Sequence, residues 1–193
     1  TNSLPVAGDR VVFNQTSSTN CFSDSIAAGL TYIGLNPGYN ATLTLSANLN
    51  GGSRTLNINE LRSYAGKLLL QGDTSVINET SGGTSSKPHG AGLTINAANV
   101  IVGPDGHISA DGQGFGPMTG PGASSVNWAS GGSYGGFGTS TDAIRDTFPY
   151  GSITGPTALG SGGATASSGG SGGGAIKLVV SDTITVRGIV SAA

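Results

Sequence analysis

Apolar and polar residues alternate in short segments along much of the chain. Residues 42–49 (TLTLSANL) and residues 55–61 (TLNINEL) both follow the period of two that places every second side chain on the same face of a strand. Residues 68–70 (LLL) form an apolar run short enough for a strand that is buried on both faces. Because no window combines helical apolar spacing with capping residues, we predict no long helix. The pattern therefore predicts an all-β protein.

Two segments that lie far apart in the sequence look like two copies of one unit. Residues 93–111 (LTINAANVIVGPDGHISAD) and residues 176–193 (IKLVVSDTITVRGIVSAA) each contain two apolar alternations separated by a polar step, then a glycine and the motif ISA or VSA. A unit of this length cannot bury its apolar face alone and must stack on a neighbour. The duplication predicts a short right-handed parallel β-helix, which is a solenoid. Short strands at this spacing leave a β-sandwich or jelly roll as the alternative.

A glycine-rich stretch, residues 112–174, separates the two copies and contains more than half of the chain's 35 glycines. Composition of this kind is also typical of disordered linkers. We divide the chain into residues 1–111, the strand-rich part of the β core, residues 112–174, a lobe inserted between two β repeats, and residues 175–193, the closing repeat.

The glycine-rich lobe also contains most of the aromatic residues of the chain. A flexible linker does not need aromatic side chains, and each of them can bury a large area. We therefore expect an ordered lobe folded back on the β core. The competing interpretation is an exposed surface that binds carbohydrate or another copy of the protein. The residues assigned to this candidate contact surface are Phe115, Trp128, Tyr134, Phe137 and Tyr150.

Charged residues make up 9% of the chain, far below the ~25% of ordinary globular domains, and the formal net charge is -2. A surface this poor in charge must be covered by Ser, Thr, Asn and Gly, which is typical of β proteins that work outside cells or pack against copies of themselves. Lys and Arg form no cluster that could neutralise phosphates, so we expect no nucleic-acid partner. No stretch approaches the ~20 apolar residues that a membrane-spanning helix needs.

We predict no catalytic, metal or cofactor site and no enzymatic activity. Asp105 and Asp111 flank glycines, but their spacing fits no calcium-binding loop. His89 and His107 have no neighbouring Cys, Glu or third His to complete a metal site. The glycine loops lack the Lys and the following helix that a phosphate-binding loop requires. Cys21, the only cysteine, cannot form a disulfide within the chain.

Three Asn-x-Ser/Thr motifs occur, at Asn14, Asn40 and Asn78. A chain so rich in Asn, Ser and Thr produces about three such motifs by chance, so the motif is not enriched. These residues are candidate glycosylation sites only in an organism that glycosylates asparagine in this context.

Two sets of motifs resemble repeats of large bacterial surface and secreted proteins. The segment PVAGDRVVF, followed by LTYIGLNPGYNATLTLSANLN, resembles the entry to such repeats. The segments GGSYGGFG, YGSITGPTALGSGG and GGSGGGAIKLVVSDTITVRGIVSA are similar to the glycine-rich, adhesin-like modules of these proteins, which close a turn of a parallel β-helix. The resemblance covers nearly the whole chain through low-complexity motifs. It implies an extracellular structural or adhesive role and carries over no catalytic residue.

We predict an extracellular or cell-surface structural protein, the subunit of a filament or surface layer that assembles through end-to-end β contacts between its own copies. A solenoid exposes unpaired strand edges at both ends, and the segment TITVRGIVSAA carries a single Arg. The N-terminal lead could supply a strand to a neighbouring copy. The alternative is an adhesin or carbohydrate-binding module of a larger surface protein, with a glycan as its partner. The residues assigned to the assembly edges are Leu4, Val6, Val11, Ile184, Val186, Ile189 and Val190.

Overall fold

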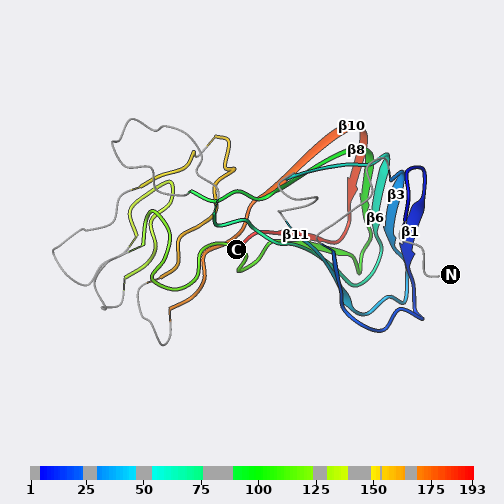
Figure 1. The fold of residues 1–193 in the computed structure, drawn as a ribbon, viewed down its shortest axis with the longest axis horizontal. Coiled ribbons are helices and arrows are strands. Elements are labelled where there is room, and N and C mark those ends of the chain that lie inside the picture. Colours follow the sequence, from blue (N-terminus) through cyan, green and yellow to red (C-terminus); the bar gives the residue numbers. More distant parts are fainter. Residues whose placement is uncertain are drawn as a thin grey trace. The chain divides into compact units, whose positions relative to one another are not determined.

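The computed structural model describes residues 5–23, 30–46, 54–75, 89–123, 130–138, 149–152, 154–163 and 169–193. Within these ranges every regular element is a β-strand, and every pairing between strands is parallel. The strands stack beside one another in the order that Figure 1 shows from β1 to β10.

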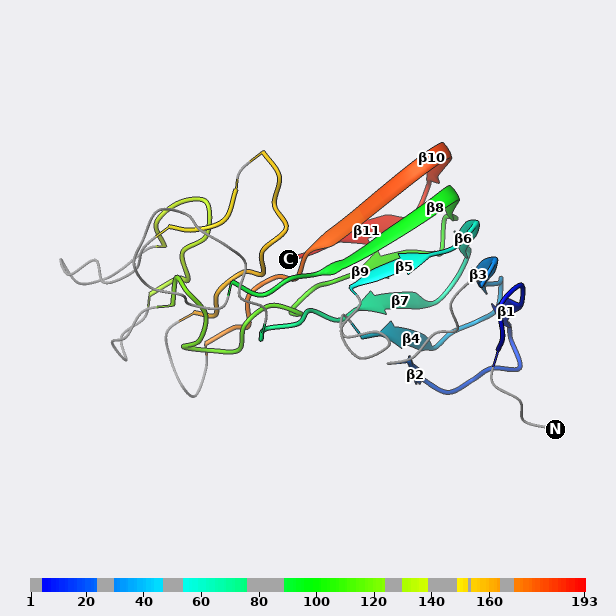
Figure 2. The same ribbon diagram turned by 45° about the horizontal axis from the view of Figure 1, so that its top comes forward.

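The strands form two sheets, and the chain passes back and forth between them (Figure 2). The six-stranded sheet has the order β1 (Arg10–Phe13), β3 (Tyr32–Leu35), β6 (Glu60–Ser63), β8 (Leu93–Val102) and β10 (Ile176–Val186), with β5 (Thr55–Asn57) paired to β8. The five-stranded sheet has the order β11 (Ile189–Ser191), β9 (His107–Ser109), β7 (Lys67–Leu70), β4 (Thr42–Leu45) and β2 (Cys21–Ser23). Each sheet therefore begins with an N-terminal strand and ends with a C-terminal strand.

The prediction of a short right-handed parallel β-helix is wrong, because the strands form two separate parallel sheets and no closed solenoid is present in the described ranges. The alternative of a β-sandwich or jelly roll is wrong as well, because those folds are built from antiparallel strands. The all-β class itself fits. The period of two identifies which face of a strand is buried, but it carries no information about the chain conformation between strands, on which closure depends.

The alternating apolar residues supply a buried core from both sheets. On β3 and β6, Ile33, Leu35 and Leu61 are buried, and on β4 and β7 the same holds for the inward-facing leucines. The two similar segments of the sequence lie side by side, since β10 pairs with β8 in parallel and β11 pairs with β9 in parallel. Burial of aliphatic columns that run from strand to strand is the main stabilising term of this unit.

Contacts between residues divide the chain into two compact units. The first comprises Thr1–Gln71, Leu93–Ser109 and Ile176–Ser191, and it contains all eleven strands. The second comprises Gly72–Gly92, Ala110–Ala175 and Ala192–Ala193. The second unit thus includes residues 72–92 in addition to the whole glycine-rich lobe, residues 112–174.

Backbone segments in the second unit lie against one another without forming a sheet. The amide of Gly114 donates to the carbonyl of Gly172 at 2.8 Å, and the amide of Gly160 donates to the carbonyl of Gly173 at 2.9 Å. A Cβ at position 114 would lie only 2.5–2.6 Å from the carbonyl oxygens of Gly173, Gly160 and Gly172. Glycine is required here because any side chain would separate segments that satisfy each other's backbone groups.

We predict that Gly114→Ala destabilises the second unit by about 1–3 kcal/mol, the cost of overpacking a close contact. Gly136→Ala is the matched control, because a Cβ at that position meets nothing within 4 Å. Urea unfolding followed by near-ultraviolet circular dichroism measures both variants. Equal stability of the two would contradict the close packing of these segments.

Candidate functional site

Exposed apolar side chains gather on the edge strands of both sheets. Among the described residues, nine large apolar side chains are exposed, and five of these belong to β10 and β11: Val179, Ile184, Val186, Ile189 and Val190. Two others, Val12 and Phe22, belong to β1 and β2, the first strands of the two sheets. The edges at both ends of the sheets are therefore the strongest candidate contact surface.

The C-terminal edge of the six-stranded sheet leaves the aliphatic core columns uncovered. Ile184 and Val186 are in register with Val100 and Val102 of β8. Val100 and Val102 are 0% exposed, whereas Ile184 is 53% and Val186 48% exposed. The difference arises because β8 has strands on both sides, while the described residues place none on the outer side of β10. Ile184 and Val186 thus belong to the same aliphatic columns as the core, but they are exposed to solvent.

The five-stranded sheet ends in the same way. Val190 of β11 is in register with Ile108 of β9. Ile108 is 0% exposed and Val190 is 40% exposed, and the adjacent Ile189 is 56% exposed. Four of the residues assigned to assembly edges from the sequence are consequently brought together on two strands of one unit.

At the N-terminal edge the side chains that continue the core columns are less exposed. Val11 of β1 is half-buried beside Ile33, and Cys21 of β2 is a half-buried free thiol beside Leu43. Val6 is exposed in a turn before β1, where its amide donates to Asp9 Oδ2 at 2.8 Å. Leu4, also assigned to an edge, lies outside the described residues. Donation of a strand by the N-terminal lead therefore stays a prediction.

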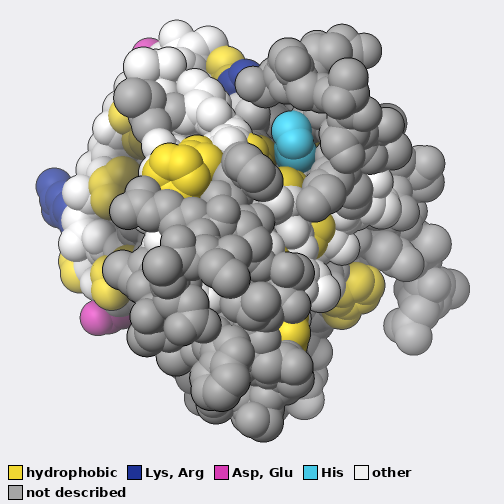
Figure 3. All heavy atoms as spheres, turned by 90° about the vertical axis from the view of Figure 1, so that its left-hand side faces the viewer, with side chains coloured by type: hydrophobic (Ala, Val, Ile, Leu, Met, Phe, Trp, Pro, Cys, Tyr) yellow, Lys and Arg dark blue, Asp and Glu magenta, His cyan; other side chains and the backbone are white. Residues whose placement is uncertain are grey.

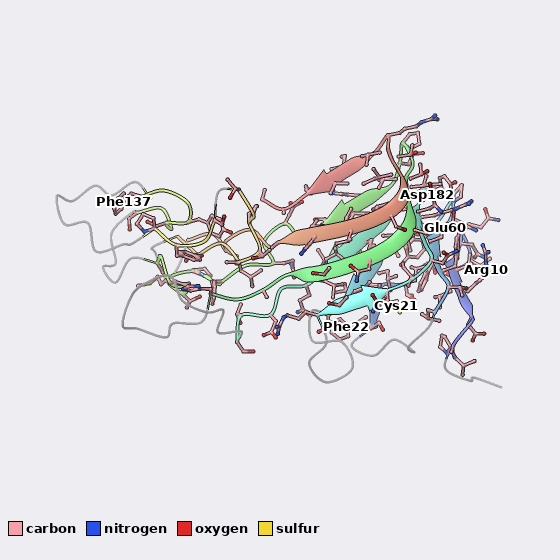
Figure 4. The ribbon with its side chains drawn as sticks, turned by 90° about the horizontal axis from the view of Figure 1, so that it is seen from above. Arg10, Cys21, Phe22, Glu60, Phe137 and Asp182 are labelled. Atoms are coloured by element: carbon pink, nitrogen blue, oxygen red, sulfur yellow. The ribbon has the colours of Figure 1, made fainter. Side chains whose placement is uncertain are left out.

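The charged and aromatic side chains at these edges were not found from the sequence. Figure 4 shows Arg10 on β1, Phe22 beside Cys21 on β2, and Asp182 on β10. The Arg10 guanidinium lies 4.0 Å from the centre of the Tyr32 ring, a cation–π contact. Phe22 stands in a polar segment, where its outward position could have been inferred from the alternation with Cys21. No sequence signal pairs Arg10 with a ring one strand away.

Elsewhere the described surface is polar and carries few charges. On the face drawn in Figure 3, hydrophobic side chains form separate patches, and charged side chains are few. The structure gives one ion pair in the described ranges, between Arg62 and Glu60 at 2.6 Å. The exposed edge strands thus lie on a molecule that has little charge to keep copies apart.

Most described aromatics of the glycine-rich lobe are packed inside the second unit. Phe115 is buried with Leu159 and Ala175, and Tyr150 is buried with its hydroxyl donating to the carbonyl of Leu159. The ring of Tyr134, which is half-buried, meets the Tyr150 ring edge-on at a centroid distance of 5.1 Å.

Phe137 is 54% exposed, so it is the only described residue assigned to the contact lobe whose ring is largely accessible to solvent. Trp128 lies outside the described residues. The buried rings anchor the second unit and offer little surface to a ligand.

The hydroxyl of Tyr150 is held in an environment that disfavours ionisation. Burial raises the pKa of Tyr150 to about 12, while the hydrogen bond from Ser161 Oγ at 2.8 Å opposes this rise. Burial also raises the pKa of Tyr134. A neutral tyrosine at this position donates and accepts one hydrogen bond each, which ties residues 150, 159 and 161 together.

Two of the three candidate glycosylation sites, Asn14 and Asn40, lie outside the strands. Asn14 is exposed, and its side-chain oxygen accepts hydrogen bonds from the amide and hydroxyl of Thr16, at 3.0 and 2.6 Å. Asn40 is exposed two residues before β4 begins. Asn78 lies outside the described residues. The geometry leaves Asn14 and Asn40 accessible.

The histidines and acidic residues considered for metal binding have different surroundings. His107 Nε2 is 2.9 Å from Ser191 Oγ, and the His89 ring packs at 5.5 Å from that of Tyr150. Asp105 is exposed in a turn, and Asp111 accepts a hydrogen bond from the amide of Ala193 at 2.8 Å. In the part of the chain that the structure describes, no group of three His, Cys, Asp or Glu side chains is placed to hold a metal ion.

No helix among the described residues is long and apolar enough to span a membrane. No protein-family model, curated protein sequence or solved structure matches the chain. The resemblance to glycine-rich modules of bacterial surface proteins therefore stays a prediction.

We predict that stability falls between about pH 10 and pH 12, because the unfolded chain ionises Tyr150 at its ordinary pKa of 10.0 while the folded protein keeps it neutral to about 12. The free energy of unfolding should fall by roughly 2–3 kcal/mol over this range, and Tyr150 should cause no fall well below pH 10. In Tyr150→Phe the fall should be smaller. Chemical unfolding at a series of pH values measures it, with Tyr64→Phe as the control. An unchanged slope in Tyr150→Phe would contradict the assignment.

Proposed function

We propose that this protein is an extracellular structural protein whose copies assemble end to end, through the edges of their sheets, into a filament or layer. One observation carries the proposal. The last strand of each sheet, β10 and β11, exposes the side chains that continue the buried aliphatic columns. An uncovered row of backbone and apolar groups of this kind is a template for pairing with another chain.

The C-terminal edge has few of the devices that keep edges from pairing. β10 is 11 residues long and contains no proline and only two charges, Lys177 and Asp182. Its pairing with β8 is irregular between Val180 and Thr183, which is one such device. The segment after this irregularity, residues 183–186, resumes the regular ladder and is uncharged. This segment is the part of the edge best suited to accept a further strand.

A second copy is the partner that fits these edges. All strands are parallel, and both sheets run from an N-terminal strand to a C-terminal strand. A copy placed beyond β10 and β11 would present β1 and β2 in the same direction. Such a contact joins two different surfaces and does not close on itself, so it generates a filament. Both sheets contribute at once because both end in one unit.

The extracellular assignment draws support from composition. With 9% charged residues and 35 glycines, the chain resembles proteins that pack against copies of themselves more than it resembles ordinary globular domains. The resemblance to bacterial surface repeats points the same way.

The alternative function, an adhesin or carbohydrate-binding module, would use the aromatics of the glycine-rich lobe. Phe115 and Tyr150 are buried within the second unit, so they are not free to stack on a sugar. Phe137 is exposed and is the residue such a role would need. We therefore favour assembly over glycan binding.

We predict that Ile184→Asp abolishes assembly, because it would place a charge in the apolar column that the next copy must cover. The variant should still fold, because Ile184 is 53% exposed in a single copy. Phe137→Asp is the matched control, since Phe137 is 54% exposed but lies in the other unit. Electron microscopy and sedimentation of concentrated wild-type protein and both variants make the test. The proposal would be contradicted by a wild-type protein that stays monomeric, or by an Ile184→Asp variant that still assembles.

A further inference from the structure

We infer that β1 of each copy adds to residues 183–186 of the preceding copy in one defined register, set by an ion pair between Arg10 and Asp182. This inference rests on the proposed assembly and specifies its contact. It follows from the strand register within one copy and from the charges at its two edges.

Within a copy, the ladder of the six-stranded sheet is continuous from β1 through β3, β6 and the second half of β8 to residues 183–186 of β10. One in-register column joins five residues from edge to edge: Val11, Ile33, Leu61, Val100 and Ile184. The column before it consists of Arg10, Tyr32, Glu60, Asn99 and Thr183. A shift by one residue would turn every side chain to the wrong face, so the apolar column excludes odd shifts of an added strand. The ion pair then selects one of the remaining registers.

Continuing the ladder into a second copy covers the exposed residues. In this register Val11 of the second copy lies beside Ile184, and Phe13 lies beside Val186. The five-stranded sheet follows the same rule, since Cys21, Leu43, Leu68, Ile108 and Val190 form one column. The second copy would therefore place Cys21 beside Val190. The second copy would thus be held by two short strand contacts at once, one in each sheet, and the two together would bind it more strongly than either contact alone.

The charges at the two edges are complementary in this register. Arg10 would lie beside Thr183, directly next to the exposed Asp182. Glu60 supplies the carboxylate in the column of Arg10. Within a copy this carboxylate already forms an ion pair with Arg62 at 2.6 Å. Asp182 accepts only a long hydrogen bond of 3.4 Å from its neighbour Thr183 among the contacts described. Each charge is thus available to a partner of opposite sign.

Charge reversal tests the ion pair. Arg10→Asp and Asp182→Arg should each raise the critical concentration for assembly by about tenfold, because like charges then meet at the contact. The double variant restores the opposite signs and should return toward the wild-type value. Failure of the double variant to recover, with assembly of the wild type intact, would overturn the ion pair.

Cysteine crosslinking tests the register. Val190→Cys gives each copy a second thiol beside the Cys21 of the next copy, at about the 4.8 Å spacing of neighbouring strands. Oxidation or a short bifunctional thiol reagent during assembly should give a ladder of covalent oligomers on a denaturing gel. The wild type, with Cys21 alone, cannot extend beyond a dimer. Ile189→Cys is the control, because residue 189 points to the opposite face of β11 and should give no ladder.

The outcomes separate this inference from the proposed function. A ladder with Val190→Cys and none with Ile189→Cys supports the register. Filaments that give no ladder with Val190→Cys, or one only with Ile189→Cys, overturn the register and leave assembly standing. Wild-type protein that forms no filaments overturns the proposed function and this inference together.

Discussion

Parallel pairing in fixed register is the constraint on which the rest of the first unit depends. Each strand of a parallel sheet directs its amide and carbonyl groups to both sides, so an interior strand needs two neighbours. β3, β6 and β8 have them, and their inward side chains are buried. The same pairing rule that builds the core leaves β10 and β11 with one neighbour each in the described structure. In the proposed assembly, stability within a copy and attraction between copies therefore come from the same strand pairing.

The second unit satisfies its backbone by different means. Glycine segments such as those around Gly114 and Gly172 lie close enough to exchange amide–carbonyl hydrogen bonds, with no ordinary strand ladder. A few larger side chains, above all Phe115, Leu159 and Tyr150, fill the space that glycines cannot. Most of the described aromatic residues that suggested a binding surface are thus structural. Their burial is the main reason to look for the partner surface on the strand edges.

The sequence predicted the class of the fold and much of the core. The alternation indicated the buried face correctly at Leu43, Leu45, Leu56 and Ile58. It failed at the end of residues 55–61, where Glu60 is half-buried and Leu61 is buried, because one strand ends at Asn57 and another begins at Glu60. Leu68–Leu70 was expected to be buried on both faces, but Leu69 is only half-buried because it faces outward. The closed β-helix was wrong because local alternation does not encode how the chain turns between sheets.

The candidate surface was only partly predictable. Ile184 and Val190 were assigned to an edge because they belong to the last apolar repeat, and they are exposed on the last strands. The proposed pairing of Arg10 with Asp182 could not be inferred from the sequence. Only the ladder of the folded sheet shows that Arg10 shares a column with Thr183, the residue next to Asp182. Register is a property of the paired sheet and not of either segment alone.

The axial rise of the assembled protein, measured by electron cryomicroscopy or fibre diffraction, tests the central claim most directly. Along the direction of stacking each copy contributes five successive strands to either sheet, since β5 lies off the path from β1 to β10. Neighbouring strands lie about 4.8 Å apart, so copies joined edge to edge should repeat every ~24 Å, with a strong reflection near 4.8 Å along the axis. Filaments with an unrelated axial repeat, or a protein that remains monomeric at high concentration, would contradict the account.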